Sequence, residues 1–177
     1  MKKRKTFISY YHKDEDYKNK FEELFEDIIV NKSVRAEDID VNNHDQYTKE
    51  LIQKDYLKDV TVLVVLISQK TRCRKHVDWE IAAALNHKVG GIYAGLVGIR
   101  LPSHSDYGLE ENYNPNNIPD RLADNLKKNG EGYASIHDWT EDIEEMKDII
   151  NNAFYRRTSH EDERVNSKKQ MDKNLCN

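Results

Sequence analysis

One glutamate in this 177-residue sequence stands where the helical pattern predicts an apolar side chain. At about 100° per residue, a helix over residues 75–87 turns one apolar face inward, made of Val77, Ile81, Ala84 and Leu85. Glu80 falls inside that face or at its edge. A buried carboxylate costs free energy unless it is paired or used. Glu80 is therefore either a structural residue that reaches solvent or a loop amide, or a positioned carboxylate that lines a cleft.

Other polar residues give weaker signals. His12 follows the first expected strand and is a site candidate, whereas the remaining histidines are expected to be solvated. The acidic run at residues 14–16 opens a helix, where the helix dipole favours negative charge. Trp79 lies on the side of its helix away from Glu80, which predicts a role in packing or assembly.

Several known kinds of site are excluded because the sequence lacks their motifs. No Gly-x-Gly-x-x-Gly follows a strand, and no phosphate-binding loop ends in Gly-Lys-Ser or Gly-Lys-Thr. The most apolar strand ends Leu66-Ile67-Ser68-Gln69, without the aspartate that a phosphorelay receiver requires.

Composition narrows the function further. A net charge of −4 provides no basic excess for nucleic acid. The longest apolar run, the eight residues 60–67, is far shorter than the roughly 20 that span a bilayer. Two cysteines predict neither a disulfide framework nor a zinc site, so a reducing cytoplasm is the expected compartment.

Alternating strand-like and helix-like stretches must position these residues. Strands are expected at residues 6–10, 60–67, 91–100 and 133–138, with a weaker one at 34–36. Helices are expected after Asp14 or Asp16, after Asn43 or Asp45, over 75–87 and after Thr140. This order predicts an α/β fold of three layers, with about five parallel strands and helices on both faces, as in flavodoxin-like domains. Ligands of such sheets bind beyond the carboxyl ends of the strands.

Residues 1–155 form one expected domain, and two polar stretches lower the hydrophobic content to 37%. Residues 102–132 hold all three prolines and are expected to be a long loop insertion over the strand ends, which could close over a substrate or bind a partner. Residues 156–177 have no aromatic side chain and are expected to be a disordered tail or a detached helix.

Three segments resemble a known family. Phe7-Ile8-Ser9-Tyr10-Tyr11-His12, followed by Asp14 or Asp16, resembles the opening motif of TIR and TIR-like domains. Thr71-Arg72 with Val77-Asp78-Trp79-Glu80-Ile81 is similar to the helix that carries the catalytic glutamate of TIR enzymes that cleave NAD. Residues 118–125, with 132–134 and Asp138-Trp139, resemble the TIR-like subfamily of the ThsB subunits of bacterial Thoeris antiphage defence. The resemblance spans about residues 5–155 and implies a TIR-like fold.

The resemblance implies cleavage of the nicotinamide–ribose bond of NAD, which would be the substrate and not a cofactor. Glu80 would be the catalytic carboxylate, and the other product would be ADP-ribose, a cyclised isomer or an ADP-ribosyl conjugate. One carboxylate suffices because nicotinamide leaves as a neutral molecule and needs no general acid, unlike the leaving group of ordinary glycosidases. The expected substrate-binding residues lie on loops at the strand ends and are Ser9, Tyr10, His12, Asn43, Thr71 and Arg72. No metal is expected.

Two functions remain open from the sequence. The first is an NAD-cleaving enzyme of antiphage defence whose nucleotide product diffuses to a separate effector, since no effector domain or membrane segment is evident. A phage-derived trigger and a homo-oligomer are open features of this hypothesis. The second is a non-catalytic TIR-type scaffold or adaptor that self-associates through the partly apolar far side of the Glu80 helix.

Overall fold

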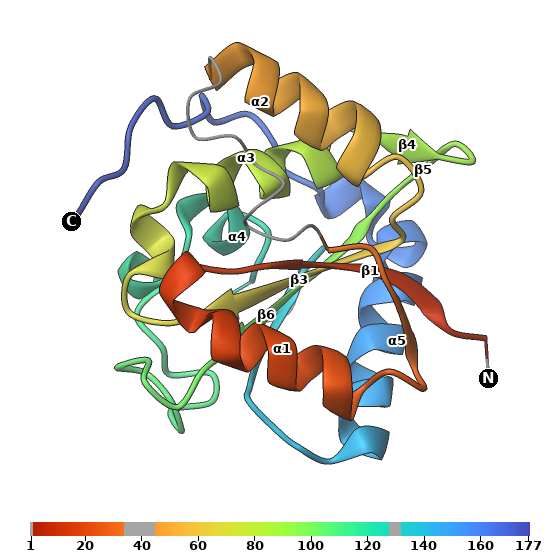
Figure 1. The fold of residues 1–177 in the computed structure, drawn as a ribbon, viewed down its shortest axis with the longest axis vertical. Helices are drawn as coiled ribbons and strands as arrows, with labels where there is room; N and C mark the ends of the chain where they lie inside the picture. The colour runs from red at the N-terminus through yellow and green to blue at the C-terminus, as the bar shows by residue number, and fades with distance from the viewer. Residues whose placement is uncertain (1, 34–44, 128–131) are drawn as a thin grey trace.

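A parallel sheet of five strands forms the centre of the computed structural model, which describes residues 2–33, 45–127 and 132–177 (Figure 1). The strands are β1 (Arg4–Ser9), β2 (Ile29–Asn31), β3 (Val62–Ile67), β6 (Gly95–Arg100) and β7 (Ser135–Asp138). Their order across the sheet is β2-β1-β3-β6-β7. β3 is buried along its whole length, as its run of branched residues indicates for a central strand.

Helices cover both faces of this sheet. On one face lie α1 (Glu15–Leu24) and α5 (Ile143–Ser159); on the other lie α2 (Asp45–Leu51), α3 (Lys75–Ala84) and α4 (Asp120–Ala123) (Figure 1). Side chains of β3 alternate between the two layers: Leu63, Val65 and Ile67 join the core beneath α3, and Val62, Val64 and Leu66 join the core beneath α1 and α5. The predicted three-layer α/β fold is confirmed.

Element boundaries differ from the sequence pattern in two places near the helices. The helix expected after Asp14 or Asp16 ends at Leu24, although its apolar helical spacing continues through Ile28 and Ile29, and Ile29 instead pairs with Arg4 in the sheet as the start of β2. The cap of α5 is Asp142, whose side chain accepts a hydrogen bond from the Glu145 amide, and not Thr140. The weaker strand expected at residues 34–36 lies outside the described residues.

A short hairpin follows α3 where the sequence predicts the end of a helix and the start of a strand. Its strands are β4 (Lys88–Val89) and β5 (Ile92–Tyr93), which pair antiparallel. Gly90 and Gly91 between them have φ of 62° and 82°, a combination that suits a tight two-residue hairpin turn.

Both polar stretches are folded where the structure describes them. The loop after β6 lies over the ends of β6 and β7, where the Gly108 amide donates to Asp138 Oδ2 at 2.9 Å. The same stretch forms α4, whose Arg121 and Leu122 are buried. The expectation of a disordered or detached tail is corrected: α5 runs to Ser159, and later residues are held against α3 and α4 by hydrogen bonds that hydrophobic patterning does not register.

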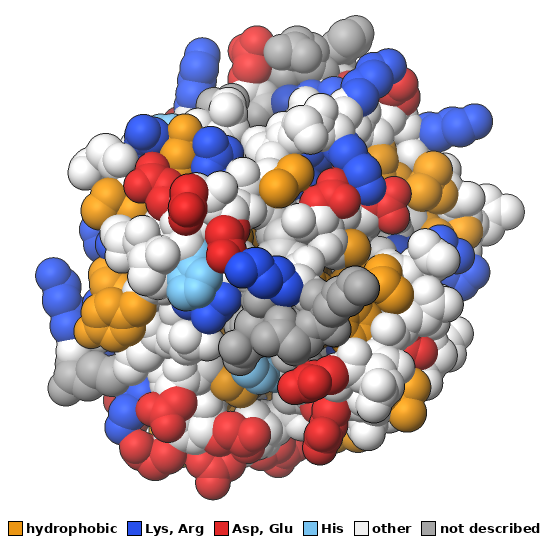
Figure 2. All heavy atoms as spheres, turned by 180° about the vertical axis from the view of Figure 1, so that it is seen from behind, with side chains coloured by type: hydrophobic (Ala, Val, Ile, Leu, Met, Phe, Trp, Pro, Cys, Tyr) orange, Lys and Arg blue, Asp and Glu red, His pale blue; other side chains and the backbone are white. Residues whose placement is uncertain are grey.

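Charge is mixed on the face of the molecule opposite to the view of Figure 1. Acidic and basic side chains alternate there, with acidic ones gathered along the lower edge (Figure 2). This agrees with the nearly balanced composition of 28 basic and 32 acidic residues. None of the helices in the described ranges combines the length and apolar character needed to cross a membrane.

Candidate functional site

The carboxyl ends of β1 and β3 mark the point where the strand order reverses. From β1 the chain moves outward to β2, and from β3 it moves the other way to β6 and then β7. Loops that leave adjacent strands in opposite directions leave a crevice between them, which is where open parallel sheets bind ligands. The loops after Ser9 and after Ile67 both begin at this edge, as the sequence predicts.

Glu80 reaches this edge from α3 and meets β1 at Ser9. Phe7 packs in the core beneath α3, and because side chains alternate along a strand, Ser9 points to the same side. Ser9 is fully buried and Glu80 is 8% exposed. Within the described part of the chain, neither Ser9 Oγ nor Glu80 Oε2 completes a hydrogen bond of good geometry. The pair is therefore a buried polar contact with spare hydrogen-bonding capacity.

The pKa of Glu80 is raised from 4.5 to about 8, because the effect of burial outweighs the lowering effect of the nearby Ser9 hydroxyl. The pKa of Tyr10 is raised to about 12, first by burial and then by the charges of Glu15, Glu80 and Glu22. Both groups hold their protons at neutral pH in the free protein. A buried acid with a strongly raised pKa at a strand-end crevice is a feature that functional sites share.

A second polar contact joins the loops that follow β1 and β3. Ser68 Oγ donates to Asp14 Oδ2 at 2.5 Å, and the Ser68 amide donates to Thr71 Oγ1 at 2.9 Å. Burial raises the pKa of Asp14, while the Ser68 hydrogen bond and His12 lower it. Asp14 makes no side-chain cap to α1, and its carboxylate instead accepts from Ser68 in the loop after β3. The acidic residue was visible in sequence, but no local pattern pointed to Ser68 as its partner.

The expected substrate-binding residues divide into three groups. Ser9 and Tyr10 lie near Glu80: Ser9 lowers the pKa of Glu80, and the charge of Glu80 helps to raise the pKa of Tyr10. Thr71 is fully buried, and its Oγ1 accepts a hydrogen bond from the Ser68 amide. His12 and Arg72 are exposed.

The two exposed residues occupy different surroundings. The ring of His12 meets Tyr11 edge-on with centroids 4.5 Å apart, in the loop that follows β1. Arg72 lines a narrow groove with Arg74 and Met171, on the tail side of α3. The structure therefore does not bring Arg72 together with Glu80. Asn43 lies outside the described residues.

Trp79 is turned away from this site and is 1% exposed. Its Nε1 donates to the Met171 carbonyl oxygen at 2.8 Å, and the ammonium groups of Lys49 and Lys75 lie 4.8 and 5.0 Å from its ring centre. The far face of α3, which the scaffold hypothesis offers as a contact surface, is covered by the tail and by α2 of the same chain.

No group of three or more histidine, cysteine, aspartate or glutamate side chains within residues 2–33, 45–127 and 132–177 is placed to hold a metal ion.

The strand order and the crevice define a flavodoxin-like α/β domain of the TIR-like kind. The family model of the TIR-like domain of the Thoeris protein ThsB matches residues 7–106, more than half of the chain. The chain belongs to this family. The matched stretch runs from β1 through β6 and includes Ser9, Asp14, Ser68 and Glu80. No curated protein matches the chain.

Proposed function

We propose that this Thoeris-type TIR-like domain cleaves NAD at the bond between nicotinamide and ribose, with Glu80 as the catalytic carboxylate. The observation that carries the proposal is the buried carboxyl group at the strand-order reversal, with a pKa of about 8. Among the described residues, no cationic side chain contributes to that pKa. A cationic substrate can supply the missing charge.

The reaction breaks the bond between ribose C1′ and the ring nitrogen of nicotinamide. The bonding electron pair passes to that nitrogen, so nicotinamide leaves neutral and the positive charge moves to the ribose. A carboxylate shielded from water stabilises this charge strongly, because the site is already organised and of low dielectric. Attack of water at C1′ then gives ADP-ribose and a proton, whereas attack by a group of the nucleotide itself gives a cyclic isomer.

Substrate binding and ionisation of Glu80 are coupled in this proposal. A positive charge close to a carboxyl group favours its ionised form, so the nicotinamide ring would lower the pKa of Glu80 as it binds. Ser9 would then donate to the carboxylate and fix its orientation. Tyr10 would offer aromatic surface beside the ribose, and His12 would lie at the rim.

The product acts, in this proposal, as a diffusible signal to a separate effector protein in antiphage defence, with a phage component as the trigger. This part rests on membership in the Thoeris family.

Nicotinamide release from NAD tests the chemistry. The measurement compares wild type, Glu80→Gln and Glu23→Gln, a control on an exposed glutamate of α1. Both purified protein and lysate from phage-infected cells are assayed, since the trigger is part of the proposal. We expect Glu80→Gln to lose about 100-fold or more, the usual loss for a group that stabilises developing charge. Equal release from Glu80→Gln and wild type, or no release from wild type in either preparation, contradicts the proposal.

A further inference from the structure

The tail forms a strap along α3, which we define as residues 164–176. It begins at Arg164, whose Nη1 donates to the Leu85 carbonyl oxygen at 2.6 Å, at the carboxyl end of the helix. It ends at Cys176, which is bonded to Cys73 just before the amino end of the helix. The strap therefore runs antiparallel to α3 over its whole length, as the blue tail in Figure 1 shows.

Polar contacts hold the middle of the strap to the helix. Asn166 Nδ2 donates to the Ala82 carbonyl oxygen at 3.1 Å. The Met171 amide donates to Asp78 Oδ2, and the Trp79 indole donates to the Met171 carbonyl oxygen, both at 2.8 Å. The strap thus covers the face of α3 that points away from Glu80.

The end of the strap supplies the cap that α3 lacks. Arg74, at the N-cap position, makes no side-chain cap, and the first amides of a helix need an acceptor from elsewhere. Asn174 Oδ1 accepts from the Lys75 amide at 2.9 Å, and the Leu175 amide donates to the Cys73 carbonyl oxygen at 2.9 Å. The strap therefore orders the first turn of the helix that carries Glu80.

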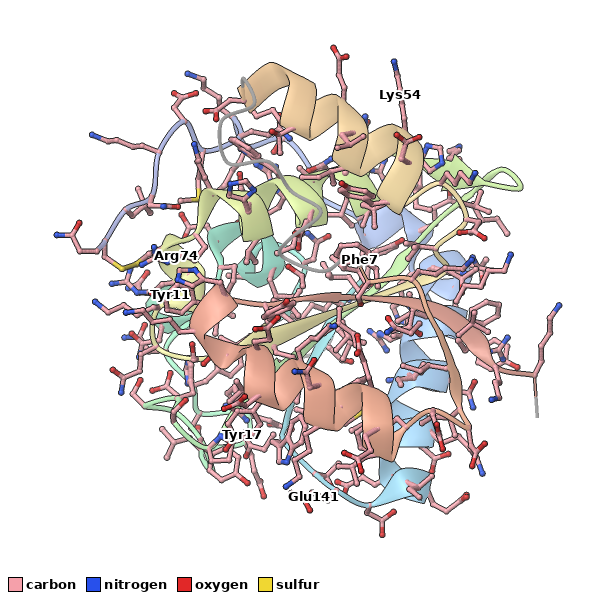
Figure 3. The ribbon with its side chains drawn as sticks, viewed as in Figure 1. Phe7, Tyr11, Tyr17, Lys54, Arg74 and Glu141 are labelled. Atoms are coloured by element: carbon pink, nitrogen blue, oxygen red, sulfur yellow. A yellow bond between two sulfur atoms is a disulfide. The ribbon has the colours of Figure 1, made fainter. Side chains whose placement is uncertain are left out.

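Arg74 connects the end of the strap to the loop after β1. Its Nη2 donates to the Cys176 carbonyl oxygen at 2.9 Å, and its guanidinium lies 4.3 Å from the ring centre of Tyr11. Arg74 and Tyr11 lie side by side at this end of α3 in Figure 3. Arg74 therefore links the strap end directly to the loop after β1 that contains Tyr11.

Cys73 and Cys176 form a disulfide, a pairing that the expectation of no disulfide framework did not foresee. Few apolar groups anchor this end without it, since Leu175 is 60% exposed, and segments with few buried apolar contacts open at low free-energy cost. The bond keeps the strap end at a high effective concentration beside the helix. In a reducing compartment, a single disulfide of this kind is transient or redox-sensing and not a permanent brace.

We propose that the Cys73–Cys176 disulfide and the strap form a redox-operated latch on α3. A dithiol reductant opens it by thiol–disulfide exchange: its thiolate attacks one sulfur and expels the other cysteine as a thiolate, and its second thiol then displaces the attacked cysteine from the mixed disulfide. Two electrons pass to the protein, both cysteines end as thiols, and the reductant becomes a disulfide. The strap end then leaves the helix, uncovers Trp79 and removes the Asn174 cap. Exchange with a disulfide oxidant closes the latch again.

Trp79 fluorescence and tryptic cleavage test the latch on the full chain, in a Trp139→Phe background that leaves Trp79 as the sole indole. We expect dithiothreitol to shift Trp79 emission to the red. Cleavage after Lys168, Lys169 and Lys173 should become about tenfold faster or more, because the strap end loses its tether. Cys176→Ser is the matched control and should behave as the reduced form with or without reductant. Identical emission and cleavage in the two redox states of the Cys73–Cys176 pair overturn the latch.

The effect on Glu80 rests on the proposed function, and nicotinamide release from the same samples tests it. We expect release to fall on reduction of the otherwise native chain and to be insensitive to reductant in Cys176→Ser, because a loosened helix holds the carboxylate less well. Strap opening without nicotinamide release in either redox state contradicts the proposed function and supports the latch. Strap opening with unchanged release contradicts the link to Glu80. A strap that does not open contradicts the latch, whatever the release.

Discussion

The Ser9 hydroxyl lies against the Glu80 carboxyl group at the carboxyl end of β1, where burial, only partly offset by Ser9, raises the carboxyl pKa to about 8. A strand residue and a helix residue far apart in the sequence thus form one buried polar pair. The raised pKa affects both the stability and the reactivity of the protein, because ionising Glu80 without a partner costs free energy in the folded state.

The stability of the protein should depend on pH through Glu80. The folded pKa of about 8 lies above the ordinary value of 4.5, so between these values the folded state holds a proton that the unfolded chain has lost. Glu80 therefore stabilises the fold fully below pH 4.5, and this contribution falls by about 1.4 kcal/mol per pH unit until it is lost near pH 8. Urea denaturation of wild type and Glu80→Gln at pH 5, 6.5 and 8 should show the variant gaining relative stability as pH rises. A difference that is constant across this range contradicts the raised pKa.

Nicotinamide release should rise with pH if Glu80 acts as a carboxylate. The pH profile of kcat/KM reports the free enzyme, in which the pKa of Glu80 is about 8. We expect kcat/KM to increase about tenfold per pH unit below that value and to level off above it. The kcat profile should level off at lower pH, because the cationic substrate lowers the pKa of the bound state. A kcat/KM profile that is flat from pH 6 to 9 contradicts the assigned role.

Ser9→Ala should raise the pKa of Glu80 further, since it removes a polar neighbour that favours the charged form. The rising limb of the kcat/KM profile should move to higher pH, with only a modest loss of stability. Ser135→Ala is the matched control, because Ser135 is equally buried but lies on β7. A Ser9→Ala profile that coincides with that of Ser135→Ala contradicts a role for Ser9 at Glu80.

Asp14 and Ser68 should be energetically coupled across the crevice. Their 2.5 Å hydrogen bond joins the loops after two adjacent strands, and removing Ser68 leaves the partly buried Asp14 carboxylate without this donor. In a double-mutant cycle of Asp14→Asn and Ser68→Ala, urea denaturation should give a coupling energy of about 1–3 kcal/mol. Additive effects of the two substitutions would show that the contact contributes nothing to the fold.

Arg121 should be a larger determinant of stability than any surface cation. Its guanidinium pairs with Asp78 at 2.9 Å, also donates to Asn166 Oδ1 and the Lys168 carbonyl oxygen, and is 2% exposed. Arg121→Ala leaves Asp78 charged and buried, which should cost about 3–5 kcal/mol. Lys168→Ala is the control: it breaks a solvent-exposed pair with Asp124 and should cost no more than about 1 kcal/mol. Equal midpoints in urea for the two variants contradict this ranking.

The sequence alone determined the architecture, because hydrophobic periodicity is a local property. The run from Val60 to Ile67 specified a strand buried on both faces, and the alternation around it specified a parallel sheet covered by helices. The same periodicity set Glu80 apart on an otherwise apolar helix face. The structure confirmed the fold, and it placed Glu80 at the strand ends, while the role of that residue remains a proposal.

Only the tertiary structure decided the contacts between distant segments. No sequence pattern links the residues that make these contacts. They are the hydrogen bond from Ser68 to Asp14, the ion pair of Arg121 with Asp78, and the packing of the tail on α3. Polar hydrogen bonds leave no periodic trace in a sequence, so a tail rich in charged and amide side chains resembled a disordered one. Two cysteines likewise become partners only when folding brings their α-carbons to 5.4 Å, a distance that depends on the path of the whole chain between them.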